Sequence, residues 1–276
     1  RMVTRVCHSR SLVEIDPEKV YKRQVRDYER NVSKFVTLPA HARARRVILE
    51  ENLAKLSKDT EARAVNTMEI TDQDVGIITS GASYNYVKEA FGDRYSVLKL
   101  GLVYPFDQEI IRDFARQVKK IYVVEELDPY LEFNVRAMGI ECEGKKYISP
   151  FFELNQQVVA TSLARAGLEP LEELDPAAKE PAPDVPVRPP ILCAGCPHRA
   201  FFYLARREKV TVVGDIGCYT LGAAPPLDGI DVSACMGGGY SIALGLSINP
   251  PEGKKIFGVV GDSTFYHSGI TGAIDA

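Results

Sequence analysis

The sequence lacks several features that would assign a protein to a class at once. It has no apolar run near the ~18–20 residues needed to cross a bilayer, so we expect no contact with a membrane. Its 34 basic and 37 acidic residues give a net charge of −3, which excludes a strongly basic surface for nucleic acid. The remaining composition, 45% hydrophobic and 26% charged, excludes collagen, coiled coil and wholesale disorder.

A secretory signal is also missing, because the N-terminal segment RMVTRVCHSR has no apolar core. We therefore expect a cytoplasmic protein whose six cysteines stay reduced. Position 1 is Arg rather than an initiator Met, and the sequence stops at Ala276 inside a helical pattern. These features predict an internal piece of a longer protein.

Hydrophobic patterning divides the chain into five parts. Residues 1–20 read as the end of one unit, and residues 21–74 as a linker with a helix. Residues 75–165 alternate short apolar strands with helices, which predicts βαβ units and a parallel sheet. Residues 166–190 hold seven of the 17 prolines and predict an extended linker. Residues 191–276 hold 14 of the 21 glycines and four of the six cysteines, so we expect the chemistry there.

The helix expected in the first linker covers residues 41–57. An apolar stripe on one of its faces is formed by Val47, Ile48, Leu49, Leu53 and Leu56. The stretch 17–63 around it has 12 Lys or Arg against 7 Asp or Glu, and forms either a solvated surface or a site for an anionic partner.

Three acidic residues in the part with alternating strands and helices carry finer predictions. Asp107 directly precedes a helical pattern and is expected to cap that helix. Glu125 and Glu126 end a strand, where such a pair either interacts with loop solvent or takes part in function.

Four cysteines lie in the final part of the chain. Cys193 and Cys196 have CxxC spacing, and Cys218 and Cys235 follow at longer intervals. Thiolates in this pattern either bind a metal or an iron–sulfur cluster, or belong to loops without such a role. The second pair is not a CxxC, which argues against a zinc ribbon.

Two glycine-rich segments predict an anion site. The run from Met236 to Gly239 follows a strand-like segment and opens a helix, where free N–H groups bind phosphate unless the glycines serve only close packing. Asp262 follows an apolar strand in the sequence Gly261-Asp262-Ser263. At the end of a parallel strand an aspartate is a natural Mg²⁺ ligand beside a phosphate, although a lone aspartate there can simply cap a helix.

Taken in order, these segments resemble the diphosphate-binding domain of thiamine diphosphate enzymes. The likeness is to the 2-oxoacid:ferredoxin oxidoreductases, and most of all to the large subunit of their indolepyruvate type. It rests on four segments, CAGCPHR at 193–199, GDIGCYTLG at 214–222, MGGGYSIALG at 236–245 and GDSTFYHSGI at 261–270. Four earlier segments agree, TRVCHSRSLVEI at 4–15, LPAHARAR at 38–45, GIITSGASYNYVKEA at 76–90 and VVEELDP at 123–129.

The resemblance implies an α/β architecture of two domains. Residues 1–20 would end a pyrimidine-binding domain, and residues 75–165 would form a transketolase C-terminal-like domain with a parallel sheet. Residues 191–276 would form the N-terminal half of the thiamine diphosphate-binding domain.

The activity implied is ferredoxin-dependent oxidative decarboxylation of aryl 2-oxoacids. Indolepyruvate, coenzyme A and oxidised ferredoxin would give indoleacetyl-CoA, CO₂ and reduced ferredoxin. The cofactors implied are thiamine diphosphate, Mg²⁺ and 4Fe-4S clusters, of which those of a ferredoxin module lie outside this chain. The partners implied are a small (beta) subunit and ferredoxin, and this piece alone is expected to be inactive.

The resemblance also assigns roles to residues, though none of them is a catalytic group. Asp262 would bind Mg²⁺, and the residues that would contact the cofactor are His198, Gly217, Cys218, Met236, Gly237, Gly238, Gly261 and Ser263. Cys193, Cys196 and Cys218 match three ligands of a 4Fe-4S cluster in pyruvate-type relatives, and whether they hold one here stays open.

Two other functions remain open at this point. A non-redox thiamine diphosphate-dependent 2-oxoacid decarboxylase shares the glycine-rich and Gly-Asp features, but does not need the CxxC. A non-catalytic scaffold of the same fold would bind no cofactor.

Overall fold

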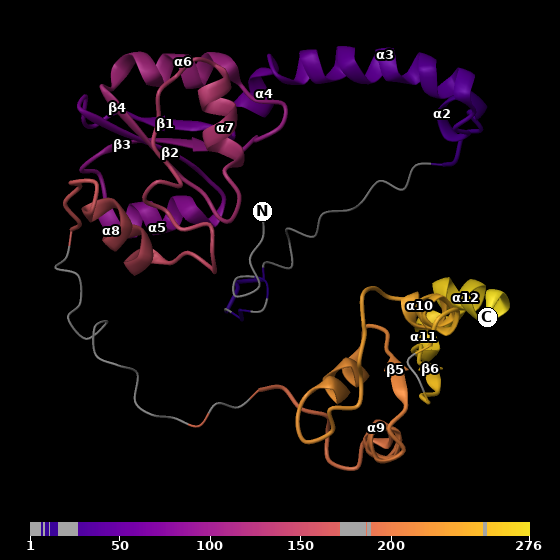
Figure 1. The fold of residues 1–276 in the computed structure, drawn as a ribbon. Coiled ribbons are helices and arrows are strands. Elements are labelled where there is room, and N and C mark those ends of the chain that lie inside the picture. Colours follow the sequence, from indigo (N-terminus) through magenta and orange to yellow (C-terminus); the bar gives the residue numbers. More distant parts are fainter. Residues whose placement is uncertain are drawn as a thin grey trace. The chain divides into compact units, whose positions relative to one another are not determined.

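The computed structural model describes residues 7, 9–10, 12–15, 27–171, 186, 189–250 and 253–276. The chain divides into two compact units, the first ending at residue 181 and the second beginning at residue 182 (Figure 1). Most of the segment expected to end a pyrimidine-binding domain, and most of the proline-rich linker, lie outside the described residues.

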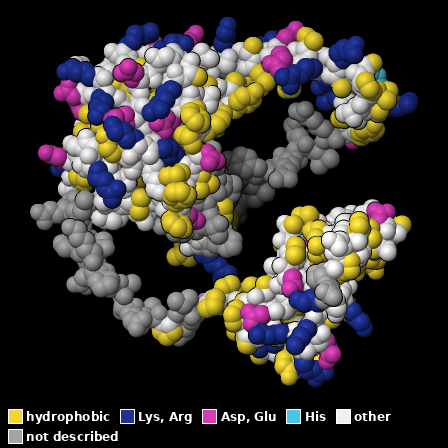
Figure 2. All heavy atoms as spheres, in the orientation of Figure 1, with side chains coloured by type: hydrophobic (Ala, Val, Ile, Leu, Met, Phe, Trp, Pro, Cys, Tyr) yellow, Lys and Arg dark blue, Asp and Glu magenta, His cyan; other side chains and the backbone are white. Residues whose placement is uncertain are grey.

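In residues 27–66, three helices precede the sheet of the first unit, α2 (Val32–Phe35), α3 (Pro39–Leu56) and α4 (Thr60–Arg63). The helix expected over 41–57 is confirmed as α3, which begins at a proline that suits the first helical position. Its apolar stripe is not buried: the side chain of Val47 is 58% exposed and that of Leu49 is 47% exposed. Hydrophobic side chains therefore lie on the surface over this part of the molecule (Figure 2).

The first unit is built on a four-stranded sheet with the order β1-β3-β2-β4. Its strands are β1 (Thr67–Glu69), β2 (Val75–Ser80), β3 (Ser96–Leu100) and β4 (Lys120–Val124). β2 runs parallel to both β3 and β4, which confirms the predicted parallel sheet. The short edge strand β1 runs antiparallel to β3 and was not predicted.

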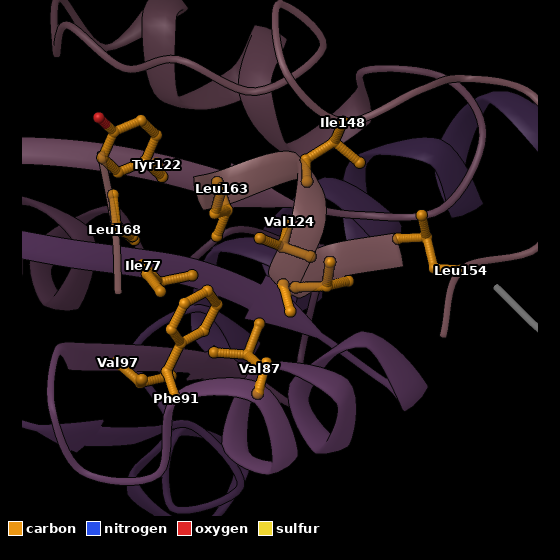
Figure 3. Close-up of a cluster of buried hydrophobic side chains, with 13 residues drawn as sticks. Ile77, Val87, Phe91, Val97, Tyr122, Val124, Ile148, Leu154, Leu163 and Leu168 are labelled. Atoms are coloured by element: carbon orange, nitrogen blue, oxygen red, sulfur yellow. The ribbon is translucent and has the colours of Figure 1, made fainter. Parts of the chain in front are cut away.

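Helices cover both faces of this sheet, α5 (Ala82–Phe91), α6 (Gln108–Gln117), α7 (Tyr130–Ala137) and α8 (Gln156–Ala164). Successive strand residues point to opposite faces, so Ile77 packs in one core cluster and Ile78 in the other. Figure 3 shows the first cluster, in which Phe91 of α5 and Leu163 of α8 lie near Ile77. The sheet therefore has two apolar faces, which explains its nearly continuous hydrophobic strands.

Carboxylates anchor the helices of the first unit to the strand ends. The buried Asp107 side chain accepts hydrogen bonds from the backbone N–H groups of Glu109 and Ile110, which confirms it as the cap of α6. Glu125 accepts from the N–H groups of Leu131 and Glu132 in the first turn of α7. Glu125 is therefore buried and structural rather than exposed to loop solvent.

The second unit is smaller and contains a two-stranded parallel sheet. Its elements are α9 (Pro197–Arg207), β5 (Thr211–Val213), the 3₁₀ helix η3 (Cys218–Ala223), α10 (Gly238–Ser247), β6 (Ile256–Gly258), α11 (Asp262–Thr264), the π-helix η4 (Phe265–Gly269) and α12 (Ile270–Asp275). One core cluster, centred on the fully buried Phe202, joins α9 to β5 and η3. In the described part of the chain, no helix has both the length and the apolar character of a bilayer span.

Candidate functional site

The carboxyl ends of β5 and β6 form one edge of the second sheet, because the two strands are parallel. The same four residues, Val-Val-Gly-Asp, stand at both strand ends: the copy at 212–215 begins inside β5, and the copy at 259–262 follows β6. Two aspartates therefore follow neighbouring strands, at the kind of edge where open α/β sheets bind ligands.

The strand register places these two aspartates at different depths. Thr211 pairs with Ile256, so continuing the pairing sets Asp215 level with Val260. Asp262 lies two residues beyond that level, or about 6–7 Å further along an extended chain. This offset explains why Asp215 is fully buried, whereas Asp262 is exposed at the outer end of the edge.

Asp262 is not a helix cap, which removes the simplest structural alternative for this residue. The N-cap position of α11 belongs to Gly261, and Asp262 is the first residue of the helix. Its carboxylate is therefore on the surface at a strand end, as the magnesium prediction requires.

Asp215 is a fully buried acidic residue just after the end of β5. Its Oδ1 atom accepts hydrogen bonds from the N–H of Ile216, at 2.8 Å, and from the N–H of Gly237, at 2.7 Å. Its Oδ2 atom is buried and has no hydrogen-bond partner among the described residues. A buried carboxylate oxygen without a hydrogen bond lowers the stability of the fold, so such groups call for a structural or functional explanation.

Tyr219 contacts the Gly261–Asp262 turn that follows β6. Its hydroxyl oxygen accepts a hydrogen bond from the N–H of Gly261 at 2.9 Å, and the residue is only 7% exposed. Burial, together with the negative charge of Asp215, raises the pKa of Tyr219 to about 12. Its ring lies beside that of His198, with the ring centroids 5.5 Å apart.

The glycine-rich turn before α10 is closely packed. Gly237 has a φ of +87°, and a Cβ added to it would lie 2.6 Å from the Ser268 Oγ atom, so only glycine fits. Its N–H donates to Asp215, and the N–H of Gly238 donates to the carbonyl of Cys235 at 3.0 Å. These two N–H groups are engaged within the protein, and a place for either glycine beside a diphosphate stays a prediction.

The predicted cysteine ligands are near the N-terminus of α9 and the start of η3. Cys193 and Cys218 are exposed, and the Cys196 sulfur lies 3.3 Å from His198 Nδ1. Within the described ranges, no group of three or more His, Cys, Asp or Glu side chains is arranged to hold a metal ion. Ligation of an iron–sulfur cluster by these cysteines stays a prediction.

The other residues expected to contact a cofactor lie at the surface. Met236 is 52% exposed, and Gly217 and Ser263 are also exposed. Met236 directly precedes Gly237 and Ser263 directly follows Asp262, whereas Gly217 lies two residues from both Asp215 and Tyr219. Their predicted contacts with a cofactor are compatible with these positions.

The donor set of this edge suits a magnesium-bound diphosphate. Mg²⁺ prefers one or two carboxylates together with waters and phosphate oxygens, and Asp262 offers an exposed carboxylate. Two buried oxygens beside the glycine turn, Asp215 Oδ2 and Ser268 Oγ, have no hydrogen-bond partner in the described structure. Gly239 lets α10 approach β6 closely, because a Cβ there would lie 2.3 Å from the carbonyl oxygen of Val259.

Three residues of this edge escaped the sequence reasoning, namely Asp215, Tyr219 and Ser268. A signal for Asp215 was present, because the repeated Val-Val-Gly-Asp marks two strand ends of the same kind. Tyr219 and Ser268 gave no such signal, since their positions depend on contacts with residues far away in the sequence.

Comparison with curated proteins finds relatives along the whole chain. A protein from Archaeoglobus fulgidus named indolepyruvate oxidoreductase subunit IorA is 40% identical, with 100% of this chain and 46% of the relative aligned. Proteins of the same name from Pyrococcus abyssi and Methanothermobacter marburgensis are each 34% identical, with 100% of this chain and 48% and 47% of the relatives aligned. The chain spans about half the length of the curated relatives it matches.

No family model matches the chain. Among solved structures, a 2-oxoglutarate:ferredoxin oxidoreductase from Magnetococcus marinus, with 2-oxoglutarate, coenzyme A and succinyl-CoA bound, has a TM-score of 0.36 at 19% identity. That alignment covers 47% of this chain and 24% of the other.

Proposed function

Since this chain is a homologue of indolepyruvate oxidoreductase subunits IorA over its whole length, as the sequence resemblance predicted, we propose that it forms part of a ferredoxin-dependent 2-oxoacid oxidoreductase. The substrate class is an aryl 2-oxoacid, with coenzyme A as acyl acceptor and ferredoxin as electron acceptor. A small subunit completes the enzyme, and this chain alone is inactive because it supplies only part of the cofactor site.

The second unit supplies the magnesium and diphosphate part of that site. Asp262 provides a carboxylate ligand to Mg²⁺, and Gly261 and Ser263 flank the bound diphosphate. When bound, thiamine diphosphate supplies the electron sink that lets a 2-oxoacid lose CO₂. The protein contributes by holding the charged end of the cofactor in one place, which keeps its reactive ring oriented.

Other residues of the second unit complete the proposed contacts. His198 lies against Tyr219 and so reaches the same edge from α9. Gly217 and Cys218 present their backbone at the start of η3, and Met236 to Gly238 form the turn before α10. The first unit, with its parallel sheet, takes the place of the transketolase C-terminal-like domain.

Whole-chain homology supports the reaction class, and one structural observation carries the role of the second unit. That observation is the exposed carboxylate of Asp262, held two residues beyond a buried strand end by the register of β5 and β6. Asp262 is neither buried nor the N-cap of α11, so its carboxylate is open to a ligand from the solvent side.

Magnesium-dependent cofactor binding tests this role in the complete protein with its partner subunit. We expect Asp262→Asn to weaken thiamine diphosphate binding by about 100-fold or more in calorimetry with Mg²⁺, since loss of a residue that merely supports a metal ligand costs about 10–100-fold. The matched control is Asp275→Asn, which removes an exposed carboxylate on α12. An unchanged affinity in Asp262→Asn would refute the assignment.

Turnover of the unaltered complete protein distinguishes the three functions that the sequence left open. With an aryl 2-oxoacid and coenzyme A, we expect reduction of ferredoxin that depends on both. Aldehyde release without ferredoxin reduction would instead identify a non-redox decarboxylase. A complete protein that binds no thiamine diphosphate would be a scaffold.

A further inference from the structure

A single short segment, residues 215–220, contacts both turns of the proposed site. We propose that Asp215 and Tyr219 are positioning residues, which hold the glycine turn before α10 and the Gly261–Asp262 turn in a fixed relation. The proposal rests on the proposed function, because the group to be positioned is the Mg²⁺ ligand Asp262. Neither residue needs to touch the cofactor.

Asp215 fixes the glycine turn. One oxygen of its carboxylate accepts the N–H of Gly237 across 22 residues of sequence, at 2.7 Å. A hydrogen bond to a charged acceptor in a buried site is strong, and here it lies at the first turn of a ten-residue helix. The start of α10 is therefore held to the end of β5 by a hydrogen bond whose acceptor is shielded from solvent.

Tyr219 fixes the turn that bears the proposed metal ligand. Its hydroxyl accepts the N–H of Gly261 across 42 residues, at 2.9 Å. Gly261 directly precedes Asp262, so this bond sets the direction in which the chain leaves β6. Of the bonds described at this turn, it is the one that a side chain makes with the backbone next to Asp262.

The segment that carries both residues is itself closed by hydrogen bonds. The Thr220 hydroxyl donates to the carbonyl of Asp215 at 2.8 Å and accepts from the N–H of Gly217 at 3.0 Å. The Ser233 hydroxyl also donates to the carbonyl of Asp215, at 3.2 Å. The two contacts are thus made by one braced turn, so a shift of one turn is transmitted to the other.

Asp215 Oδ2 is buried and has no hydrogen-bond partner among the described residues, which supports a functional reason for this arrangement. Its burial without a partner reduces stability, and cores retain such groups mainly at functional sites. A metal ligand that must stay within a fraction of an ångström of its ion gains from a braced neighbour, because small displacements at a site cost much of its binding.

Three variants and one control test the proposal in the complete protein, with Mg²⁺ and thiamine diphosphate as the probes. Tyr219→Phe removes only the hydroxyl, and Asp215→Ala removes the acceptor, so each should weaken binding about 10–100-fold, as is typical of residues that support a metal ligand. Asp215→Asn keeps an oxygen that can accept a hydrogen bond from the N–H of Gly237, so it should retain thiamine diphosphate binding close to that of the unaltered protein. Tyr203→Phe, on the exposed face of α9, should leave binding unchanged.

The kinetic signature separates positioning from catalysis and from loss of the fold. In Tyr219→Phe, the thiamine diphosphate concentration for half-maximal activity should rise, while kcat at saturating cofactor stays at the wild-type value. Unchanged affinity in both Tyr219→Phe and Asp215→Ala would overturn the proposal, and so would equal losses in Asp215→Asn and Asp215→Ala. If the unaltered protein itself binds no thiamine diphosphate, the proposed function fails instead.

Discussion

The two units place acidic residues at the same topological position, the carboxyl ends of parallel strands, but use them differently. In the first unit, the buried carboxylate of Glu125 follows β4 and accepts two backbone N–H groups, and that of Glu126 accepts the N–H of Leu154 at 3.1 Å. In the second unit, one oxygen of Asp215 has no hydrogen-bond partner among the described residues, and Asp262 is exposed to solvent. The carboxylates of the first edge are taken up by backbone hydrogen bonds, whereas the exposed carboxylate of Asp262 at the second edge is open to solvent.

The cores of the two units show a related difference. The sheet of the first unit has a packed cluster on each face, while the described part of the second has one small cluster around Phe202. Several large apolar side chains of the second unit are exposed, among them Phe257 at 43%. The same alternation of strands and helices therefore gives a well-buried sheet in the first unit and a partly uncovered sheet in the second.

The largest expected effect comes from a cavity in the better-packed unit. Phe114 is fully buried, and its ring packs so closely on Gly76 that a Cβ there would lie 2.7 Å from it. We expect Phe114→Ala to cost about 3–5 kcal/mol of stability, because a buried aromatic ring leaves both lost burial and a void. Faster hydrogen exchange of the backbone amides of β2 and β4, measured in the complete protein, would report this loss.

The control for that variant probes the second unit. Phe257→Ala removes the same ring from β6, where it is partly exposed, so amide exchange in β5 and β6 should change much less. Equal destabilisation by both variants would contradict the contrast between the cores. It would mean that Phe257 is covered in the complete protein.

A smaller effect is expected at the first edge. Glu125→Gln leaves one acceptor oxygen where the carboxylate bonds to the N–H groups of Leu131 and Glu132. We expect a loss of about 1.5–3 kcal/mol of stability, the range for hydrogen bonds to charged groups, with no change in thiamine diphosphate affinity. Asp262→Asn should show the opposite pattern, with weakened binding and unchanged stability.

On the same samples, denaturant unfolding measures the stability and calorimetry measures the thiamine diphosphate affinity. Glu89→Gln, on the exposed side of α5, is the matched control and should alter neither quantity. Weakened cofactor binding in Glu125→Gln would show that the first edge also serves the site.

The sequence predicted best what depends on local pattern. The strand Val75–Ser80 and the helix Ala82–Phe91 have the bounds that their hydrophobic periods indicate, and Asp107 caps its helix as expected. The three-residue strand β1 was missed, because it is too short to show a period and pairs with β3 some 30 residues later. The stripe of α3 was placed correctly on a helix, but periodicity alone does not say what covers it.

The site was predictable only where strand ends mark it. Asp262 follows an apolar run and could be found, and the repeat of its tetrapeptide could have revealed Asp215. Their unequal exposure could not be foreseen, since it depends on a register offset of two residues between β5 and β6. Tyr219 was out of reach for a similar reason, because its bond to Gly261 joins residues far apart in sequence.

The smallest expected effect lies at the edge strand of the first unit, which is joined to α5 by charge as well as by packing. Glu69 accepts from Lys88 Nζ at 2.7 Å and from the Tyr84 hydroxyl at 2.7 Å, and the bond from Lys88 is the main cause that lowers the pKa of Glu69. A lowered carboxyl pKa contributes stability above the ordinary value of 4.5 and loses it as the pH falls through the folded-state pKa.

We therefore expect Glu69→Gln to reduce stability by less than about 1 kcal/mol near neutral pH, as for other partly exposed pairs. The difference from the unaltered protein should shrink as the solution is acidified below 4.5, because both proteins then carry a neutral group at this position. Unfolding curves at several pH values measure this. A stability difference that stayed constant into acid would show that Glu69 contributes through packing. It would then contradict a contribution from the charge of its carboxylate.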